Sequence, residues 1–227
     1  MNPTLTKRVA AEVVGTAMLL AAVVGSGIMG ERLAAGNVAI ALLANSIATG
    51  AVLGALIVIF GPISGAHFNP VVTLASGVLR ELQLRDVAFY IAAQVGGALL
   101  GVATAHIMFG LPIFFTSIHD RSGADQVFAE AVATFGLVTV ILNCAKLRPT
   151  AVPLAVAAYI TGAYWFTAST SFANPAVTLA RSVSDTFVGI RPVNVPGFVL
   201  AQLIGAMAAT VFCRWLLPKT RTDKHDE

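Results

Sequence analysis

The chain has 227 residues, of which 57% are hydrophobic and 11% are charged, and its formal net charge is +3. A soluble domain carries about 25% charged residues, so this composition excludes a soluble globular protein and indicates an integral membrane protein. The cations lie between apolar runs, which excludes a nucleic-acid-binding face. Cys144 and Cys213 fall inside or at the end of apolar runs and are expected to be buried thiols, without a disulfide or a metal.

Six apolar runs are long enough to cross a bilayer as helices, which takes about 20 residues each. They cover residues 9–29, 36–60, 87–109, 127–145, 151–172 and 195–217. The first run is longer than the core of a signal peptide, so we interpret it as a span. Two shorter stretches, 64–79 and 172–183, are predicted to enter the membrane and turn back. The predicted fold class is an all-α membrane protein with six transmembrane helices and two re-entrant half-helices.

The distribution of Lys and Arg predicts the orientation of these spans, because cytoplasmic links are enriched in both residues. Ten lie on one side, namely Lys7, Arg8, Arg80, Arg85, Lys146, Arg148, Arg214, Lys219, Arg221 and Lys224. Four lie on the other side, namely Arg32, Arg121, Arg181 and Arg191. We therefore expect a multi-pass protein of the cell (inner) membrane with both termini in the cytoplasm and a polar cytoplasmic tail over 218–227.

The two halves of the sequence resemble each other. "AAEVVGT" matches "FAEAVAT", "HFNPVVTLA" matches "FANPAVTLA", and "AQVGGALLG" matches "AQLIGAMAA". One channel domain over 1–227 is thus predicted to contain repeats over about 8–110 and 126–217. Each repeat has three spans, an odd number, so the second is inverted and the re-entrant segments meet near the membrane midplane. Small-residue spacings such as that of Gly97 and Gly101 are expected to permit close helix packing.

Glu12 and Glu130 are the carboxylates that lie well inside spans, at matching positions of the two repeats. Charged residues within a membrane are candidates for function. We interpret each as an acceptor for the non-helical backbone of its re-entrant loop. A proton relay is the alternative, although no chain of further acids or histidines accompanies the pair. Gln94 and Gln202 also match and are expected to form hydrogen bonds between helices.

Two Asn-Pro pairs, Asn69-Pro70 and Asn174-Pro175, lie in the re-entrant segments. Asn is a preferred N-cap and Pro is favoured at the first helical position, so each pair is predicted to begin a short helix. The positive ends of the two helix dipoles then point at the membrane centre. Cations are repelled there, while the Asn amides can donate hydrogen bonds to a passing neutral solute.

These features resemble the aquaporin and aquaglyceroporin (major intrinsic protein) family over almost the whole chain, from about 12 to 216. The resemblance rests on "SGAHFNPVVTLA", "SFANPAVTLARS", the six spans and the inverted repeat. It implies a homotetramer with one pore in each subunit and passive conduction of water or small neutral solutes. The second motif keeps the family's alanine at Ala176. The first has Val71 in its place, which is expected to shift the packing slightly where the half-helices abut.

The same resemblance implies an outer constriction of four residues, which the family's offsets from the two Asn residues place at Thr49, Gly162, Ser171 and Val177. Family members usually have an aromatic residue at the first position and an arginine at the last. The pore mouth is therefore expected to be wide and without a fixed cation. A wide mouth without a fixed cation is similar to that of the aquaglyceroporins associated with bacterial arsenic resistance. The resemblance therefore predicts glycerol, arsenite-like and methylated metalloid species as solutes, together with water.

Two further residues are candidates for the pore wall. Arg181 lies nearly two helical turns after Asn174, on the same face. It is either a displaced cation at the outer vestibule or a charge that snorkels to the interface. His67 precedes Asn69 by two residues and is expected on the cytoplasmic pore wall, where pH gating is an alternative role. The histidines lack metal-ligand spacing, and we find no catalytic triad or phosphate loop. We expect no metal, no cofactor and no enzymatic activity.

Three other functions compete with a channel for small uncharged solutes. A water-selective aquaporin uses the same fold with a narrower filter. A secondary transporter also uses inverted repeats and broken helices, but is expected to carry coupling carboxylates near the midplane. Here both carboxylates are predicted to face the re-entrant loops instead. A structural membrane junction protein with a closed pore is the third alternative.

Overall fold

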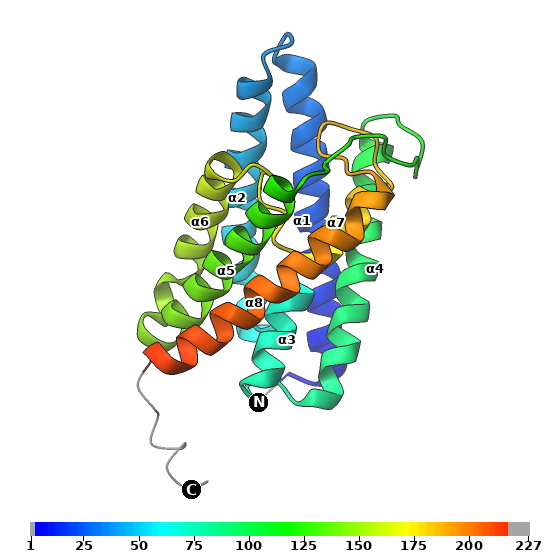
Figure 1. Ribbon diagram of the computed structural model, residues 1–227. Helices are drawn as coiled ribbons and strands as arrows, with labels where there is room; N and C mark the ends of the chain where they lie inside the picture. The colour runs from blue at the N-terminus through cyan, green and yellow to red at the C-terminus, as the bar shows by residue number, and fades with distance from the viewer. Residues whose placement is uncertain (1–2, 218–227) are drawn as a thin grey trace, which may run out of the picture.

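The computed structural model describes residues 3–217, which form a bundle of eight α-helices (Figure 1). The helices of the first half are α1 (Leu5–Leu33), α2 (Val38–Ser64), α3 (Pro70–Val78) and α4 (Leu84–Met108). Those of the second half are α5 (Ala124–Leu147), α6 (Val152–Phe166), α7 (Pro175–Arg181) and α8 (Val195–Leu216). Two short 3-10 helices, η1 (Pro149–Ala151) and η2 (Pro192–Asn194), precede α6 and α8. The predicted all-helical fold class, with two half-helices, is confirmed.

Five of these helices, α1, α2, α4, α5 and α8, are long and apolar enough to cross a bilayer. The prediction for the remaining span was wrong at its end, because α6 ends at Phe166 and residues 167–173 are not helical. The helix stops at Thr167, whose backbone is extended (φ −110°, ψ 136°), and it cannot resume at Thr170, Ser171 and Ala173, whose φ angles are 60°, 51° and 47°. These residues are apolar or small, so composition alone extended the span through them.

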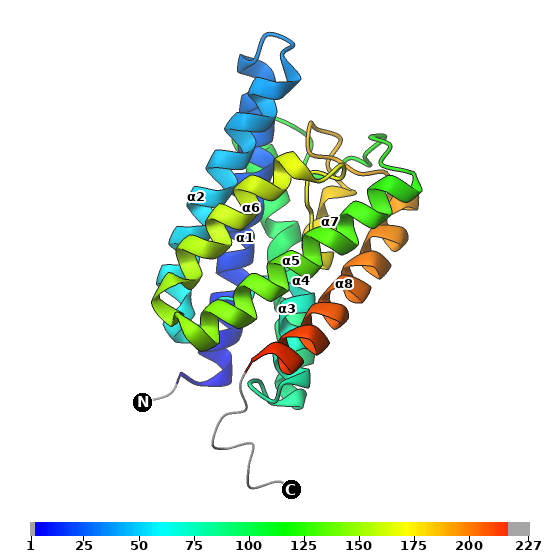
Figure 2. The same cartoon turned by 60° about the vertical axis from the view of Figure 1, so that its left-hand side comes forward.

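The two halves are joined by the packing of α2 against α6 and by the half-helices. Within each half the same pairs of helices pack together, α1 with α2 and α4, and α5 with α6 and α8. Each half-helix also reaches into the other half, because α3 contacts α8 and α7 contacts α4. Figure 2 shows α3 towards one end of the bundle and α7 towards the other. This arrangement brings the first residues of α3 and α7 close to each other in the interior.

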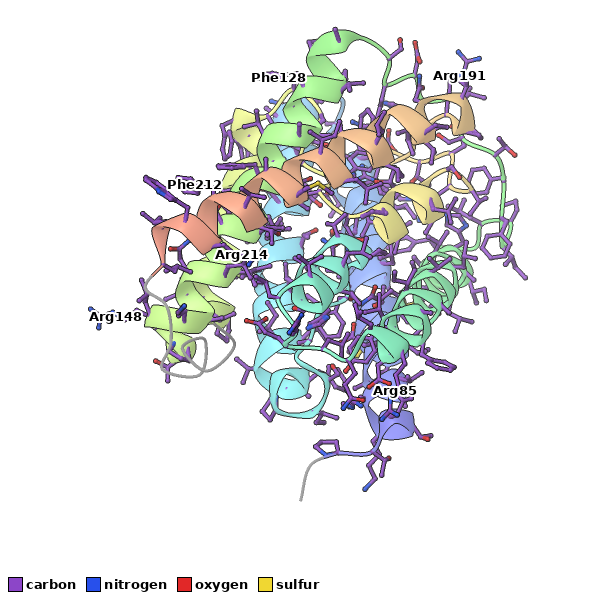
Figure 3. The ribbon with its side chains drawn as sticks, turned by 60° about the horizontal axis from the view of Figure 1, so that its bottom comes forward. Arg85, Phe128, Arg148, Arg191, Phe212 and Arg214 are labelled. Atoms are coloured by element: carbon purple, nitrogen blue, oxygen red, sulfur yellow. The ribbon has the colours of Figure 1, made fainter. Side chains whose placement is uncertain are left out.

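The charged residues separate to the two ends of the bundle. The helix α1 begins and α8 ends at the same end (Figure 1). Arg85, Arg148 and Arg214 lie at this end, and Arg191 lies at the opposite end (Figure 3). The end of the bundle that faces the cytoplasm is not fixed by this geometry and stays a prediction. The predicted tail over 218–227 lies outside the described residues.

Candidate functional site

A cavity of about 260 Å³ runs through the interior of the bundle, lined by residues of both halves. Its middle is lined by Asn69 and Asn174, the residues that precede the two half-helices. On one side of this middle the lining includes Glu81, in the link that follows α3, and on the other side Arg181, at the end of α7. The lining of the cavity therefore extends from the link after α3 to the end of α7, past the point where the half-helices meet.

The two asparagines cap the half-helices with an extended backbone, at φ −153° for Asn69 and −159° for Asn174. The Oδ1 atom of Asn69 accepts a hydrogen bond from the N–H of Val71 (3.0 Å). The Oδ1 atom of Asn174 accepts one from the N–H of Ala176 (3.0 Å). A proline at the first helical position follows each cap, where its missing N–H has no cost. The local structure is the one that the two Asn-Pro pairs predict.

Each capping asparagine also holds the loop of the opposite half. The amide nitrogen of Asn69 donates to the carbonyl of Ala173, and that of Asn174 donates to the carbonyl of Phe68, both at 2.8 Å. A carboxamide carries two N–H groups, so one per asparagine is left for a solute in the cavity. Sequence reasoning missed these reciprocal bonds, because the partners lie about a hundred residues away along the chain.

The loops that precede the half-helices adopt an unusual conformation in both repeats. Ala66 and Phe68 have φ angles of 50° and 49°, and the matching residues Ser171 and Ala173 have angles of 51° and 47°. A left-handed conformation costs roughly 1–2 kcal/mol for a residue with a side chain. Four such residues beside the cavity require support from the surrounding structure.

The two buried carboxylates supply this support. Glu12 accepts hydrogen bonds from the hydroxyl of Ser64, the N–H groups of His67 and Phe68, and the amide of Gln94. Glu130 accepts them from the N–H groups of Phe172 and Ala173 and the amide of Gln202. Every acceptor oxygen thus faces a loop or a neighbouring helix, in the same pattern in both halves. This geometry favours the structural interpretation of the carboxylates over the proton relay.

Val71 lies in a different place from the one expected of it. It is fully buried and belongs to an apolar cluster with Val138 of α5 and with Ala206 and Ala209 of α8. Its extra bulk therefore fills the contact between α3 and the second half of the chain. The expected shift at the abutment of the two half-helices does not apply to this side chain.

Three of the four residues predicted for the outer constriction line the cavity, namely Thr49, Ser171 and Val177. Gly162 is not among the lining residues. The α6 residues that line the cavity are Val152, Val156, Ile160 and Tyr164, and the Tyr164 hydroxyl lies 3.4 Å from Oγ1 of Thr49. Sequence reasoning missed Tyr164, because counting back from Asn174 selects a single position on α6. A signal existed, since a tyrosine near the end of an apolar run needs a polar partner.

Arg181 is buried beside the cavity, with 2% of its surface exposed. Its Nε donates to the carbonyl of Val188, and its guanidinium carbon lies 3.4 Å from the centroid of the Phe172 ring. A charge that snorkels to the membrane interface would be exposed. The burial of Arg181 therefore speaks against the snorkelling interpretation and places the guanidinium in the cavity wall at the end of α7.

A second cation, Arg121, stands over the same ring at 5.0 Å from the Phe172 centroid. It comes from the loop between α4 and α5 and donates to the carbonyls of Gly189 (2.7 Å) and Ser169 (3.3 Å). Burial lowers the pKa of Arg121 to about 10, which still leaves it charged at neutral pH. Arg121 thus ties the loops at the Arg191 end of the bundle together around Phe172.

His67 lines the cavity on the side of α3. Its Nδ1 lies 3.1 Å from the hydroxyl oxygen of Thr73, and its ring packs at 5.4 Å from that of Tyr90. The position on the pore wall is the predicted one, while pH gating stays a prediction. Among residues 3–217, no group of three or more His, Cys, Asp or Glu side chains is arranged to hold a metal ion.

Comparison with known proteins places the chain among channels. Residues 1–152 match the family model described as Major intrinsic protein. The chain is 55% identical to Aquaglyceroporin AqpS of Rhizobium meliloti (strain 1021), over 96% of this chain and 93% of that protein. It is 33% identical to Aquaporin NIP2-1 of Oryza sativa subsp. japonica, over 92% of this chain and 71% of that protein. The solved aquaglyceroporin from Plasmodium falciparum shares the fold, with a TM-score of 0.71 over 92% of this chain and 96% of that one, at 18% identity.

Proposed function

The chain belongs to the major intrinsic protein family, and we propose that it conducts glycerol, arsenite-like and methylated metalloid species, together with water, by passive diffusion. The family and the aquaglyceroporin relative support a multi-pass membrane channel for small solutes. The finer proposal rests on one observation. A valine, Val177, lines the outer part of the cavity three residues after the helix cap Asn174. The resemblance described above implies an arginine at this place.

The absence of an arginine at position 177 has a direct physical consequence. A guanidinium group carries five N–H donors and a charge that is always present. A valine carries neither, and the facing wall has Thr49 where an aromatic ring is usual. A pore with these two side chains has more space at this level and binds water less strongly. We infer that larger and less polar neutral solutes pass here, which favours this function over a water-selective aquaporin.

We propose that cations are excluded at the middle of the cavity. The helices α3 and α7 begin there at their asparagine caps, so the positive ends of two dipoles and one free N–H of each asparagine face a passing solute. A neutral solute replaces part of its water shell with these donors, whereas a cation meets only positive charge. We further propose a homotetramer in the inner membrane with both termini cytoplasmic, as the resemblance and the charge distribution imply.

Swelling of proteoliposomes under stopped flow tests the proposed function. We expect the fluxes of water, glycerol and arsenite to rise linearly with the gradient, without saturation and with a low activation energy. Saturation with a steep temperature dependence would support a secondary transporter instead. Water flux without glycerol flux would support a water-selective aquaporin, and no flux at all would support a junction protein.

The variant Val177→Arg is expected to reduce glycerol and arsenite flux about tenfold, equivalent to roughly 1.4 kcal/mol, while water flux persists. The new guanidinium adds bulk and donors at the level of Val177. The variant Val177→Leu adds bulk without a charge and is the matched control, so a loss confined to Val177→Arg assigns the effect to the guanidinium. Full glycerol flux through Val177→Arg would place the constriction elsewhere.

A further inference from the structure

Most of the fixed charge along the cavity favours anions. The helices α3 and α7 begin at its middle, so the positive ends of two helix dipoles face a solute there. Towards the end of α7 the wall contains Arg181, a cation at neutral pH. These features repel cations, and by the same physics they attract anions. A pore with this wall therefore needs a second element if it is to stay closed to small anions.

A carboxylate at the other end of the cavity supplies negative charge. Among the described residues that line the cavity, Glu81 is the one with an acidic side chain. It lies in the link between α3 and α4, whereas Arg181 lies at the end of α7, and Figure 2 shows the two half-helices towards opposite ends of the bundle. Glu12 and Glu130 are fully buried and do not line the cavity. The negative charge that a solute meets is thus concentrated at one mouth.

The end of α3 holds Glu81 at this mouth. Arg80 is left-handed, at φ 61°, and its N–H donates to the carbonyl of Gly77 (3.1 Å). The N–H of Glu81 donates to the carbonyl of Ser76 (2.9 Å), which completes the Schellman motif that ends many helices. The next residue, Leu82, is buried, while Glu81 is exposed at the edge of the cavity. The backbone thus fixes the carboxylate where the cavity opens.

No cation of residues 3–217 neutralises Glu81 by direct contact. Lys146, in the last turn of α5, is close enough for its charge to act on the carboxylate, but the two form no salt bridge. Burial raises the pKa of Glu81, whereas Lys146 and the nearby hydroxyl of Ser76 favour the ionised carboxylate. Two further titratable groups are near, since Arg80 precedes Glu81 in the chain and His67 lines the cavity at the same end.

From this distribution of charge we propose that Glu81 determines the exclusion of anions from the pore, at the mouth next to α3. The proposal rests on the proposed channel function and adds a second barrier, separate from the cation barrier at the middle. An anion that enters on the Arg181 side must pass the carboxylate in an opening whose other walls include Leu142, Ala145 and Val152. Charge of one sign in such an opening focuses its field on the solute. The pore then admits the neutral form of a weak acid and rejects the anion of the same acid.

Swelling of proteoliposomes in potassium nitrate tests the proposal with the full chain. Nitrate is the anion of a strong acid, so it does not cross in a neutral form. Valinomycin carries K⁺ through the bilayer, and swelling then requires that nitrate cross as well. We expect Glu81→Gln to raise the ratio of nitrate to glycerol permeability roughly threefold to tenfold, the effect of removing one charge a few ångströms from a passing anion in a hydrated mouth. Glycerol flux reports that each variant is folded and open.

Two matched variants separate the charge of Glu81 from general effects of mutation. Glu81→Asp keeps the charge at this position and is expected to keep the ratio of the wild type. Glu31→Gln removes an exposed carboxylate near the end of α1, at the other end of the bundle, and is expected to leave the ratio unchanged. An equal rise in Glu81→Asp and Glu81→Gln would mean that the length of the side chain controls the mouth, which would contradict the proposal.

Acidification removes the charge of Glu81 without a substitution. Because burial raises the pKa of Glu81 above the usual value of a glutamate, more than half of these side chains are neutral at about pH 4.3. The ratio of the wild type is expected to rise as the pH falls from about 7.5 to about 4.3, by up to the roughly threefold to tenfold of Glu81→Gln. In Glu81→Gln this rise should be absent. A rise of equal size in Glu81→Gln would assign the effect to His67 and overturn the proposal.

The remaining outcomes distinguish the role of Glu81 from the channel function. Equal nitrate fluxes through the wild type and Glu81→Gln at neutral pH, whether high or absent, would overturn the role of Glu81 while glycerol flux persists. Absence of glycerol flux through the wild type would instead contradict the proposed function itself.

Discussion

Replacement of Glu130 by alanine is expected to lower the free energy of unfolding by about 3–5 kcal/mol and to abolish solute flux. The carboxylate accepts from the N–H groups of Phe172 and Ala173 at 2.8 Å and from the amide of Gln202 at 2.6 Å. Its removal leaves three buried donors without a partner, at roughly 1–3 kcal/mol each before relaxation. The same loop holds the left-handed residues that shape the pore. Unfolding of the detergent-solubilised protein with increasing SDS, together with stopped-flow swelling, measures both effects.

Three further variants show what the carboxylate does. Glu12→Ala is expected to behave like Glu130→Ala, because Glu12 accepts from the matching loop of the first half. Glu31→Ala removes an exposed carboxylate near the end of α1 and is expected to change neither stability nor flux. Glu130→Gln keeps one acceptor oxygen but turns an NH2 group towards N–H donors, so we expect an intermediate loss of stability. A stable Glu130→Gln channel that differed only in the pH dependence of its flux would support the proton relay.

The network around these carboxylates was largely predictable from the sequence, because each of its parts has a local signal. A carboxylate inside an apolar span needs a partner, an Asn-Pro pair begins a helix, and a repeat with three spans must be inverted. Combined, they predict that Glu12 and Glu130 face the re-entrant loops, which is where the structure has them. Gln94 and Gln202 do bond between helices as expected, but the sequence did not identify the carboxylates as their partners.

The outer end of the pore was predicted less well, because its geometry depends on a backbone that hydropathy does not reveal. Residues 167–173 are small or apolar and carry no charge, so hydropathy does not mark the end of α6, yet three of them are left-handed. Counting back from Asn174 selects Gly162 of α6, whereas the α6 residues that line the cavity are Val152, Val156, Ile160 and Tyr164. The burial of Arg181 depends on Phe172 and Val188, contacts that a helix-face argument on α7 alone does not include.

Two adjacent glycines of α4 are expected to respond to the same substitution in opposite ways. A Cβ atom added to Gly97 would lie 2.5 Å from the carbonyl oxygen of Val13 in α1, closer than van der Waals contact allows. Backbone atoms on both sides of this contact cannot move aside unless the two helices separate. A Cβ atom added to Gly96 meets nothing within 4 Å. The spacing of small residues that predicts close packing thus applies to Gly97 and not to its neighbour.

Gly97→Ala is therefore expected to destabilise the protein by about 1–3 kcal/mol through overpacking. Gly96→Ala is expected to be neutral or to stabilise by up to about 1 kcal/mol, because alanine favours the helix. SDS unfolding of the two variants measures the difference between their stabilities. Both substitutions lie in α4, so the contributions of helix propensity and of the lipid exposure of this helix largely cancel in that difference. Gly101→Ala, whose Cβ would lie 2.7 Å from that of Leu20, should follow Gly97→Ala. Equal stabilities of Gly96→Ala and Gly97→Ala would mean that α1 and α4 can separate without cost. That result would contradict a rigid contact between α1 and α4, the two helices that the hydrogen bond from Gln94 to Glu12 joins.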